Sequence, residues 1–551
     1  MKKELKKKIK YSISYLLFLC AGGSVEKLLT SNAWLKRYSF ISRYLRKRGI
    51  SYEQIFYYLS EKINKYNVHS VEWEQVKNQW VKWFDQVDDH AKMFIYQLMY
   101  FTGIFDSEIT KKLVTYAKIT KIPENRYWVT MDLGVMTFRY QDALYKNYFV
   151  ERKELMEQIS YESCIVPKKQ QTTSNSCSQK ICVIAYFLTS SELNSARRVT
   201  ASIVNGLCKE GIDVCVININ SFLTDKKSVL SVNSLQFDKD HSTNKDYGII
   251  DTAKLINIFD ENYTTRLQCG LDEIYRYNPD IILDLSDEYS PISAIYSRDY
   301  CTVYKPFRSM GTSLYFYKNI IGGGKETYRI QNEKYPFIDL NRVIEWNIPE
   351  YIPVKKKKIK KDQIVDNSDE FIIVTMGNND FYIVRELADE MAILLQAEKK
   401  VTWLLVGRDA PKYLHEQYPD LFENKKIIEW GFESDLLALC ENCDIALRPN
   451  MKGGSGGTAI AAKAGLPIVL TTYRCDPMRW LGDDYVYSAT YHDCIIEIEK
   501  LIQDKKYYQC RQEVTTKKIS SAEDCPQKWK ELSSLLKMIK IDYDKDCGVR
   551  M

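Results

Sequence analysis

The pattern of hydrophobic positions divides the chain into a helical first part and two later series in which strands alternate with helices. Within the segment 71–87, large apolar side chains recur at steps of three and four residues: Trp73, Val76, Trp80, Trp83 and Val87. This spacing places one apolar stripe along a helix, and such a stripe is expected to be core. The pattern predicts an all-helical domain over residues 1–165.

Beyond residue 180, short apolar runs alternate with amphipathic segments, which is typical of βαβ units. A first series has predicted strands at 181–187, 212–219 and 279–285. A second series has predicted strands at 371–376, 401–407, 426–431, 443–449 and 466–471. Polar segments at 166–180 and 354–368 separate the parts, and the second, a run of lysines, is expected to be a solvated linker. The sequence therefore predicts an α/β protein with two Rossmann-like domains facing across a cleft.

Composition excludes several classes of protein. The chain has 551 residues, 45% hydrophobic and 27% charged, so it should fold into several domains rather than stay disordered. A net charge of +6 is too small for this length to indicate a nucleic-acid partner. The 15 cysteines include one CxxC, Cys440 and Cys443, without a second pair to complete a zinc site. A reduced cytoplasmic protein is expected.

The first residues resemble a secretory signal, because lysines precede an apolar run. That run, residues 15–20, is far shorter than the ~20 apolar residues of a membrane-spanning helix. Residues 2–20 are predicted to form a basic amphipathic helix. Two interpretations stay open: a solvated first helix packed on its neighbours, or a peripheral contact with the anionic inner face of the membrane.

One stretch, RPNMKGGSGGTAIAAKAGLPIVL at residues 448–470, concentrates four glycines immediately before an alanine-rich helix. It follows a predicted strand, so the free amides of the first helical turn point back toward the loop. Such amides and the helix dipole bind anions, and glycine lets a phosphate approach the backbone. The stretch predicts a diphosphate site, and its alternative is a tight turn without a ligand.

The segments LLVGRD, IIEWGFESDLLALCENCDIALRPN and GGSGGTAIAAKAGLPIVLTT resemble the donor-binding half of glycosyltransferases with the GT-B fold. The resemblance is strongest to the retaining group that builds bacterial surface polysaccharides. It implies transfer of a hexose from a nucleotide-diphosphate sugar to a glycan, lipid-linked or protein acceptor. It also implies that the glycine loop holds the diphosphate and that the WGF segment lies beside the base. The donor-binding residues predicted in this way are Asn378, Arg408, Trp430, Gly431, Phe432, Arg448, Asn450, Lys452, Gly453, Gly454, Ser455, Gly456, Gly457 and Thr458.

The chain departs from the family at several charged positions. The family's two glutamates around the phosphate loop correspond to Lys452 and Ile460, and its arginine and lysine after the first strand correspond to Asn378 and Ile383. A leaving diphosphate needs a cation in the transition state. Arg408, Arg448 or Lys452 is expected to supply it, and for the two arginines ion pairing with neighbouring acids is the alternative.

No metal and no cofactor besides the nucleotide-sugar co-substrate is expected. Asp-x-Asp elements occur at 238–240 and within 542–546, but the first lies in a polar stretch and the second near the end of the chain. Neither follows a buried strand, so both are interpreted as solvated charge.

The acceptor side offers three candidate general bases, Glu192, Asp287 and Glu288, in loops that follow predicted strands. Helix capping is the alternative role in this region. None of the five histidines falls in either loop.

The expected domains are a helical accessory domain at 1–165, a linker at 166–180, an acceptor-side Rossmann-like domain at 181–353, a linker at 354–368, a nucleotide-sugar domain at 369–505, and helices at 506–551 that cross back to the acceptor side. The helical domain is expected to recognise acceptor or partner. Two other functions stay open: a non-catalytic GT-B-like subunit supporting a partner transferase, and a nucleotide-sugar epimerase.

Overall fold

The computed structural model describes scattered residues and two longer helices before residue 159, most of 179–305, residues 319–322 and nearly all of 339–547. Gaps inside the last range are 351, 378, 380–382, 408–409, 450–455, 472–476, 483 and 524. The chain forms two compact units, one of Met1–Pro306, Gly311–Ile320 and Ile539–Met551, the other of Phe307–Met310 and Ile321–Met538. The domain boundaries expected from the sequence stay predictions.

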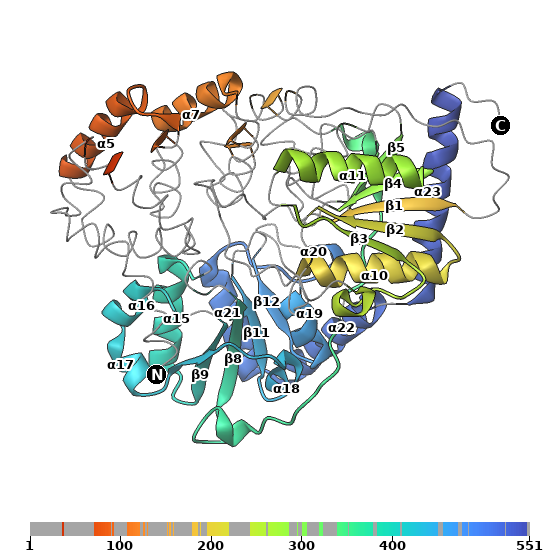
Figure 1. Cartoon of the computed structure of the whole chain (residues 1–551). Coiled ribbons are helices and arrows are strands. Elements are labelled where there is room, and N and C mark those ends of the chain that lie inside the picture. Colours follow the sequence, from red (N-terminus) through yellow and green to blue (C-terminus); the bar gives the residue numbers. More distant parts are fainter. Residues whose placement is uncertain are drawn as a thin grey trace. The chain divides into compact units, whose positions relative to one another are not determined.

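The helical region is represented by α5 (Val71–Phe84) and α7 (Ser107–Ile119), which contact each other (Figure 1). Trp80 and Val87 of the predicted apolar stripe are buried, as expected for core positions. The side chains of Trp73 and Val76, and the whole predicted basic helix at 2–20, lie outside the described residues. Within the part of the chain that is described, no helix is both long and apolar enough to cross a bilayer.

A first parallel sheet has the strand order β3-β2-β1-β4-β5-β6-β7 among the described residues. Its strands are β1 (Lys180–Ala185), β2 (Asp213–Asn218), β3 (Lys254–Asn257), β4 (Ile281–Leu285), β5 (Cys301–Tyr304), β6 (Asn319–Gly322) and β7 (Val343–Glu345). Helices α10 (Ser195–Lys209) and α11 (Tyr263–Tyr277) belong to the same series. The predicted strands at 181–187, 212–219 and 279–285 correspond to β1, β2 and β4. The central strands β1 and β4 are almost entirely buried, which explains their continuous apolar sequences.

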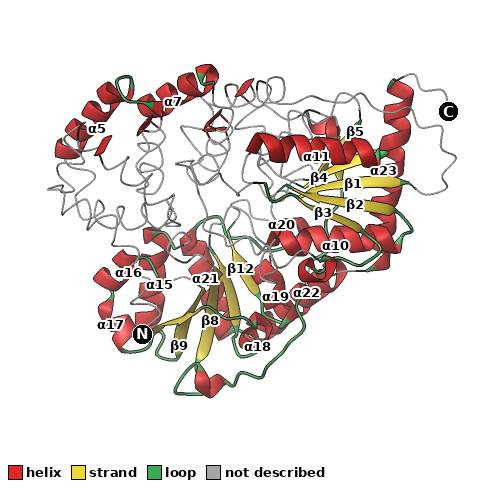
Figure 2. Ribbon diagram, in the orientation of Figure 1, coloured by secondary structure: helices red, strands yellow, loops and turns green. Residues whose placement is uncertain are grey.

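A second parallel sheet has the order β10-β9-β8-β11-β12. Its strands are β8 (Phe371–Gly377), β9 (Val401–Gly407), β10 (Ile427–Gly431), β11 (Ile445–Arg448) and β12 (Ile468–Leu470). Each corresponds to one predicted strand of the second series. The two sheets with their helices form the predicted α/β architecture (Figure 2).

Helices cover both faces of the second sheet and form two apolar clusters with it. One cluster takes residues from α18 (Leu436–Cys440), α19 (Gly456–Lys463), α20 (Met478–Leu481) and α22 (Lys505–Ala522). The other takes residues from α15 (Arg385–Ala397), α16 (Lys412–Gln417), α17 (Pro419–Glu423) and α21 (Tyr491–Gln503). This two-sided burial explains why these strands are apolar on both faces.

The basic segment 354–368 is mostly exposed, as expected for a solvated segment, but three of its apolar side chains are buried in the domain of the second sheet. Ile359, Ile364 and Val365 are buried in the first of the two apolar clusters. Lys355 and Lys361 form ion pairs with Glu441 at 2.7 Å and Asp444 at 3.5 Å, respectively. The lysine run therefore lies along the acidic side chains around α18, and its apolar positions contribute to the core.

The last helix, α23 (Pro526–Asp546), buries Trp529, Leu532 and Leu536 as its apolar pattern predicted. The Trp529 ring lies 5.8 Å from the ring of Trp346, centroid to centroid. The indole N–H of Trp346 also donates to the carbonyl oxygen of Lys528 at 3.1 Å. These residues all belong to the second compact unit, and the crossing of the helix to the acceptor side stays a prediction.

Candidate nucleotide-binding site

The second sheet reverses its strand order between β8 and β11. The chain runs outward from β8 through β9 to β10, and then returns to the other side of β8 to form β11 and β12. Open α/β sheets bind ligands beside the carboxyl ends of the strands at such a reversal. The glycine stretch starts where β11 ends, at Arg448, and leads into α19. The fold therefore places this stretch where a ligand is expected.

Seven of the predicted donor-binding residues are described. They are Trp430, Gly431, Phe432, Arg448, Gly456, Gly457 and Thr458. The other seven, Asn378, Arg408, Asn450, Lys452, Gly453, Gly454 and Ser455, lie outside the described residues, as do the predicted bases Glu192, Asp287 and Glu288.

The first turn of α19 packs against the end of β8. A Cβ atom added to Gly457 would lie 3.7 Å from the Cβ of Met376, an ordinary van der Waals contact. Gly457 also has no positive φ, so neither packing nor backbone conformation requires glycine here. One remaining reason for glycine at this position is that a ligand could approach the helix amides closely. The observation favours the anion site over the tight turn without a ligand.

Strands β8 and β9 each end in a glycine, and the close approach of the two strands requires it. Gly377 and Gly407 are register partners with φ of 130° and 115°. A Cβ atom on Gly407 would lie 2.3 Å from the carbonyl oxygen of Gly377, which no side chain permits. These two glycines bring the ends of β8 and β9 together and leave those two strand ends without side chains.

The WGF segment presents an aromatic ring at the end of β10. Gly431 has a φ of 77°, a left-handed conformation that suits glycine, and Phe432 follows it. The Phe432 side chain is 70% exposed, whereas Trp430 is half-buried and donates its indole N–H to Glu433 at 3.3 Å. Phe432 is thus free to contact a planar ligand.

Two buried carboxylates fix the backbone that follows Phe432. Glu433 accepts the N–H of Asp435 at 2.7 Å and pairs with the ammonium of Lys357 at 2.8 Å. Asp435 accepts the N–H groups of Lys356 at 2.6 Å and Lys357 at 2.9 Å, and it caps α18 through the N–H of Ala438 at 3.1 Å. The segment beside Phe432 is therefore held to residues 356–357 by charge-assisted hydrogen bonds.

The same contacts set the pKa of Glu433. Burial alone would raise this pKa, but the Lys357 ammonium, the Asp435 N–H and the Trp430 N–H together lower it below its ordinary value. A group whose pKa is lower in the folded state stabilises the protein above its unfolded pKa, about 4.3 for glutamate. That contribution is lost as the pH falls through the folded-state pKa.

We therefore expect Glu433→Gln to lower the free energy of unfolding by about 2 kcal/mol at neutral pH, because it removes a carboxylate that accepts several charge-assisted hydrogen bonds. The difference from the unmodified protein should shrink once the pH falls below about 4. Urea unfolding at neutral and acidic pH measures both effects. The matched control is Glu423→Gln on exposed α17, with an expected change below about 0.5 kcal/mol. A difference that does not depend on pH would contradict the assignment.

A buried polar chain stiffens the sheet below the site. The indole N–H of Trp403 in β9 donates to the hydroxyl of Thr375 in β8 at 2.9 Å. That hydroxyl donates to the carbonyl oxygen of Leu447 in β11 at 3.3 Å. Arg448, the next residue, is only 7% exposed and ends the strand. The chain of contacts thus ties the three strands whose carboxyl ends border the site.

Two departures from the family are buried in the core. Ile383 belongs to the cluster with α15, and Ile460 to the cluster with α18 and α19. Apolar packing explains both isoleucines. Any charge needed at the diphosphate therefore has to come from other positions.

Two strands of the first sheet carry buried polar residues near their carboxyl ends that were not among the predicted site residues. Asp284 in β4 is fully buried, and the N–H of buried Lys305 donates to its carbonyl oxygen at 3.0 Å. Asn218, at the end of β2, donates its side-chain amide to Asn257 at 2.8 Å. The available signal was an aspartate inside an otherwise apolar run, IILDL.

The cysteines of the CxxC and the described aspartates of the Asp-x-Asp elements have packing or surface roles. Cys440 and Cys443 are buried, and burial raises the pKa of the Cys440 thiol to about 12. Asp542 and Asp544 lie in α23 and pair with neighbouring lysines. Among the described residues, no three His, Cys, Asp or Glu side chains are grouped to hold a metal ion. Residues 238–240 lie outside the described part.

No family model and no curated protein matches the chain. Among solved structures, a mutant of the O-GlcNAc transferase of Thermobaculum terrenum is similar to it, with a TM-score of 0.53 and 12% identity over 99% of both chains. A glycosyltransferase from Rickettsia africae has a TM-score of 0.48 and 13% identity over 66% of this chain and 99% of its own. Anabaena HepE, in complex with UDP and glucose, has a TM-score of 0.47 and 13% identity over 65% of this chain and 99% of its own. The chain has the GT-B fold.

Proposed function

We propose that the protein is a glycosyltransferase that moves a sugar from a nucleotide-diphosphate sugar to a glycan, lipid-linked or protein acceptor. The observation that carries the proposal is the glycine-rich start of α19 at the strand reversal of the second sheet. A helix N-terminus with little side-chain cover suits a diphosphate. The fold shared with a transferase supports the same conclusion.

In this proposal the donor lies along the carboxyl edge of the second sheet. The diphosphate contacts the first turn of α19, and the base lies against the exposed ring of Phe432. Arg448, with Arg408 and Lys452, offsets the negative charge that develops on the leaving nucleoside diphosphate. We propose a metal-independent reaction in bacterial surface glycan synthesis on the cytoplasmic side of the membrane.

A second candidate function is that of a non-catalytic GT-B-like subunit that supports a partner transferase. The burial of Ile383 and Ile460 at positions where the resembled family carries charge favours it. Release of a nucleoside diphosphate from sugar donors distinguishes the two functions, because only the transferase catalyses it.

We expect the purified chain to release UDP or GDP from at least one nucleotide sugar in a panel, measured by a coupled assay. Phe432→Ala should weaken nucleotide binding by about tenfold, which corresponds to about 1.4 kcal/mol. Stacking of one base on an aromatic side chain is worth about 1–3 kcal/mol. Calorimetric titration with nucleoside diphosphates measures this affinity.

Ile496→Ala on α21 is the matched control, because Ile496 is also an exposed apolar side chain of the same domain but does not belong to the segments that follow the strands. Its affinity should equal that of the unmodified protein. Binding of nucleotide without any release from the panel would support the non-catalytic subunit. Failure to bind any nucleoside diphosphate would contradict the transferase.

A further inference from the structure

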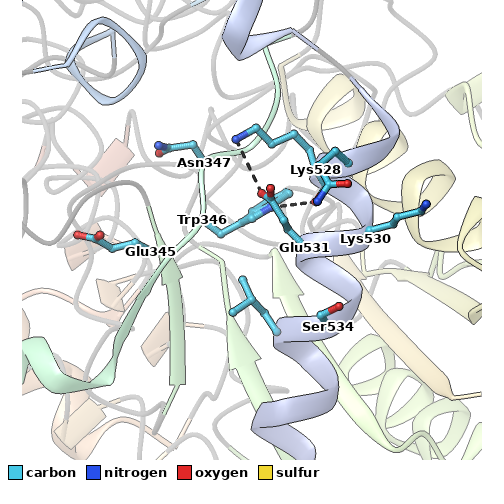
Figure 3. A pocket seen from close by; sticks show the side chains of 9 residues that line it. Glu345, Trp346, Asn347, Lys528, Lys530, Glu531 and Ser534 are labelled. Carbon is cyan, nitrogen blue, oxygen red and sulfur yellow. Dashed lines mark hydrogen bonds and ion pairs between the residues drawn. The ribbon is translucent and has the colours of Figure 1, made fainter.

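A cavity of about 500 Å³ lies in the second compact unit, and none of its lining residues belongs to the glycine stretch at 448–458. Its walls are the segment 345–347 at the end of β7 and the first turns of α23 (Figure 3). This volume is within the range of about 300–1,000 Å³ that is usual for small-molecule sites. The cavity shares no residue with the predicted donor-binding set.

Both walls are held in place by contacts of their own. Trp346 is buried and donates its indole N–H to the Lys528 carbonyl oxygen (Figure 3). Its ring also packs beside that of Trp529. Asn347 donates its side-chain amide to the carbonyl oxygen of Arg479 at 3.3 Å. Arg479 in turn pairs with buried Glu350 at 2.6 Å. The cavity therefore keeps its shape without a ligand, which reduces the ordering cost of binding.

The lining is polar but carries no net charge. Two carboxylates, Glu345 and Glu531, balance two ammonium groups, Lys528 and Lys530. The Lys528 ammonium lies 3.8 Å from the Glu531 carboxylate, so these two charges largely neutralise each other. Both glutamates would repel a phosphate, and both lysines would repel a free cation. The charges thus disfavour strongly ionic ligands.

The remaining lining groups suit a ligand with many hydroxyls. Gln527 and Asn347 offer amides and Ser534 offers a hydroxyl, so the lining contains both hydrogen-bond donors and acceptors. Trp346 and Leu535 add apolar surface. A sugar ring has hydroxyls at its edge and C–H groups on its faces, which matches both kinds of surface.

We propose that this cavity binds a neutral saccharide. The proposal goes beyond the proposed function, because the site requires no nucleotide and contains no residue of α19 or of the loop before it. It would give a transferase a second contact with the glycan part of its acceptor.

The test titrates the full chain with maltose, cellobiose and N,N′-diacetylchitobiose by calorimetry, without nucleotide. At least one of these sugars should bind with a dissociation constant in the millimolar range. Ser534→Phe should weaken that binding by tenfold or more, because the ring fills the cavity from an exposed helical position. Lys537→Phe is the matched control, since Lys537 is also exposed on α23 but does not line the cavity, and its affinity should be unchanged.

Two results would overturn the proposal: none of the three sugars binds, or Ser534→Phe binds the sugar as tightly as the unmodified protein does. Loss of nucleotide binding through changes in the α19 loop should leave saccharide binding intact. The saccharide proposal and the proposed function can therefore be refuted independently of each other.

Discussion

Replacing both Gly456 and Gly457 with leucine should weaken binding of a nucleoside diphosphate by about a hundredfold or more, which is about 2.7 kcal/mol. The two glycines form the first turn of α19, whose amides are the proposed diphosphate donors. Leucine side chains would cover these amides and keep the phosphates from the backbone. Calorimetric titration of the variant with UDP and GDP measures the loss.

The fold should survive this change. A Cβ atom at Gly457 would lie at an ordinary contact distance from Met376, and the flexible methionine side chain can move to admit the rest of a leucine. The control is the double replacement of Gly456 and Gly457 with alanine, which should raise thermal stability through helix propensity and reduce affinity by a smaller factor. If the leucine variant binds nucleotide with full affinity, the diphosphate site lies elsewhere in the chain.

Long apolar runs allowed the second sheet to be predicted from the sequence. The run VTWLLVG at 401–407 coincides with β9, because a strand buried on both faces needs an unbroken apolar sequence. Strands β3, β5, β6 and β7 were missed because each has only three or four residues and, unlike β12 within LPIVLT, none lies in a longer apolar run. A periodic pattern cannot be recognised over so short a run.

Contacts between segments far apart in the sequence could not be predicted from the local pattern. The lysine run at 354–361 has the composition of a solvated linker, but its acidic partners lie about 75–90 residues further along the chain, at Glu433, Glu441 and Asp444. The cavity of Figure 3 likewise joins residues 345–347 to α23, more than 180 residues apart in sequence. No spacing rule connects such segments, so only the folded chain reveals them.

The candidate site was predictable in part. Glycine density at a strand-to-helix junction identified the α19 loop, because the backbone amides of a helix start are a local property. The role of Glu433 was missed, since it depends on the ammonium of Lys357 and on Trp430 rather than on a motif. Ile460 could be placed in the core only once the helix face toward the sheet was known.

The second large effect is expected at a buried ion pair that joins α21 to α22. The Arg511 guanidinium lies 3.3 Å from the Glu497 carboxylate, and their side chains are only 5% and 11% exposed. The guanidinium also stacks 4.1 Å from the ring centre of Tyr485. The Tyr485 hydroxyl donates to the carbonyl oxygen of Ile468 in β12 at 2.9 Å, so one cluster connects both helices with the sheet.

Arg511→Met should lower the free energy of unfolding of this domain by about 3–5 kcal/mol, because it leaves the Glu497 carboxylate buried without its cation. The hydroxyl of Tyr507, which donates to that carboxylate at 2.8 Å, cannot replace the lost charge. Urea unfolding, together with hydrogen exchange of the α21 and α22 amides, measures the change. Adding Glu497→Gln to Arg511→Met should recover part of the lost stability, because the double variant no longer has a buried carboxylate without a cation. This recovery distinguishes the effect of a buried charge from that of lost packing. A double variant as unstable as the sum of the two single variants would show that the arginine acts through packing on Tyr485 alone.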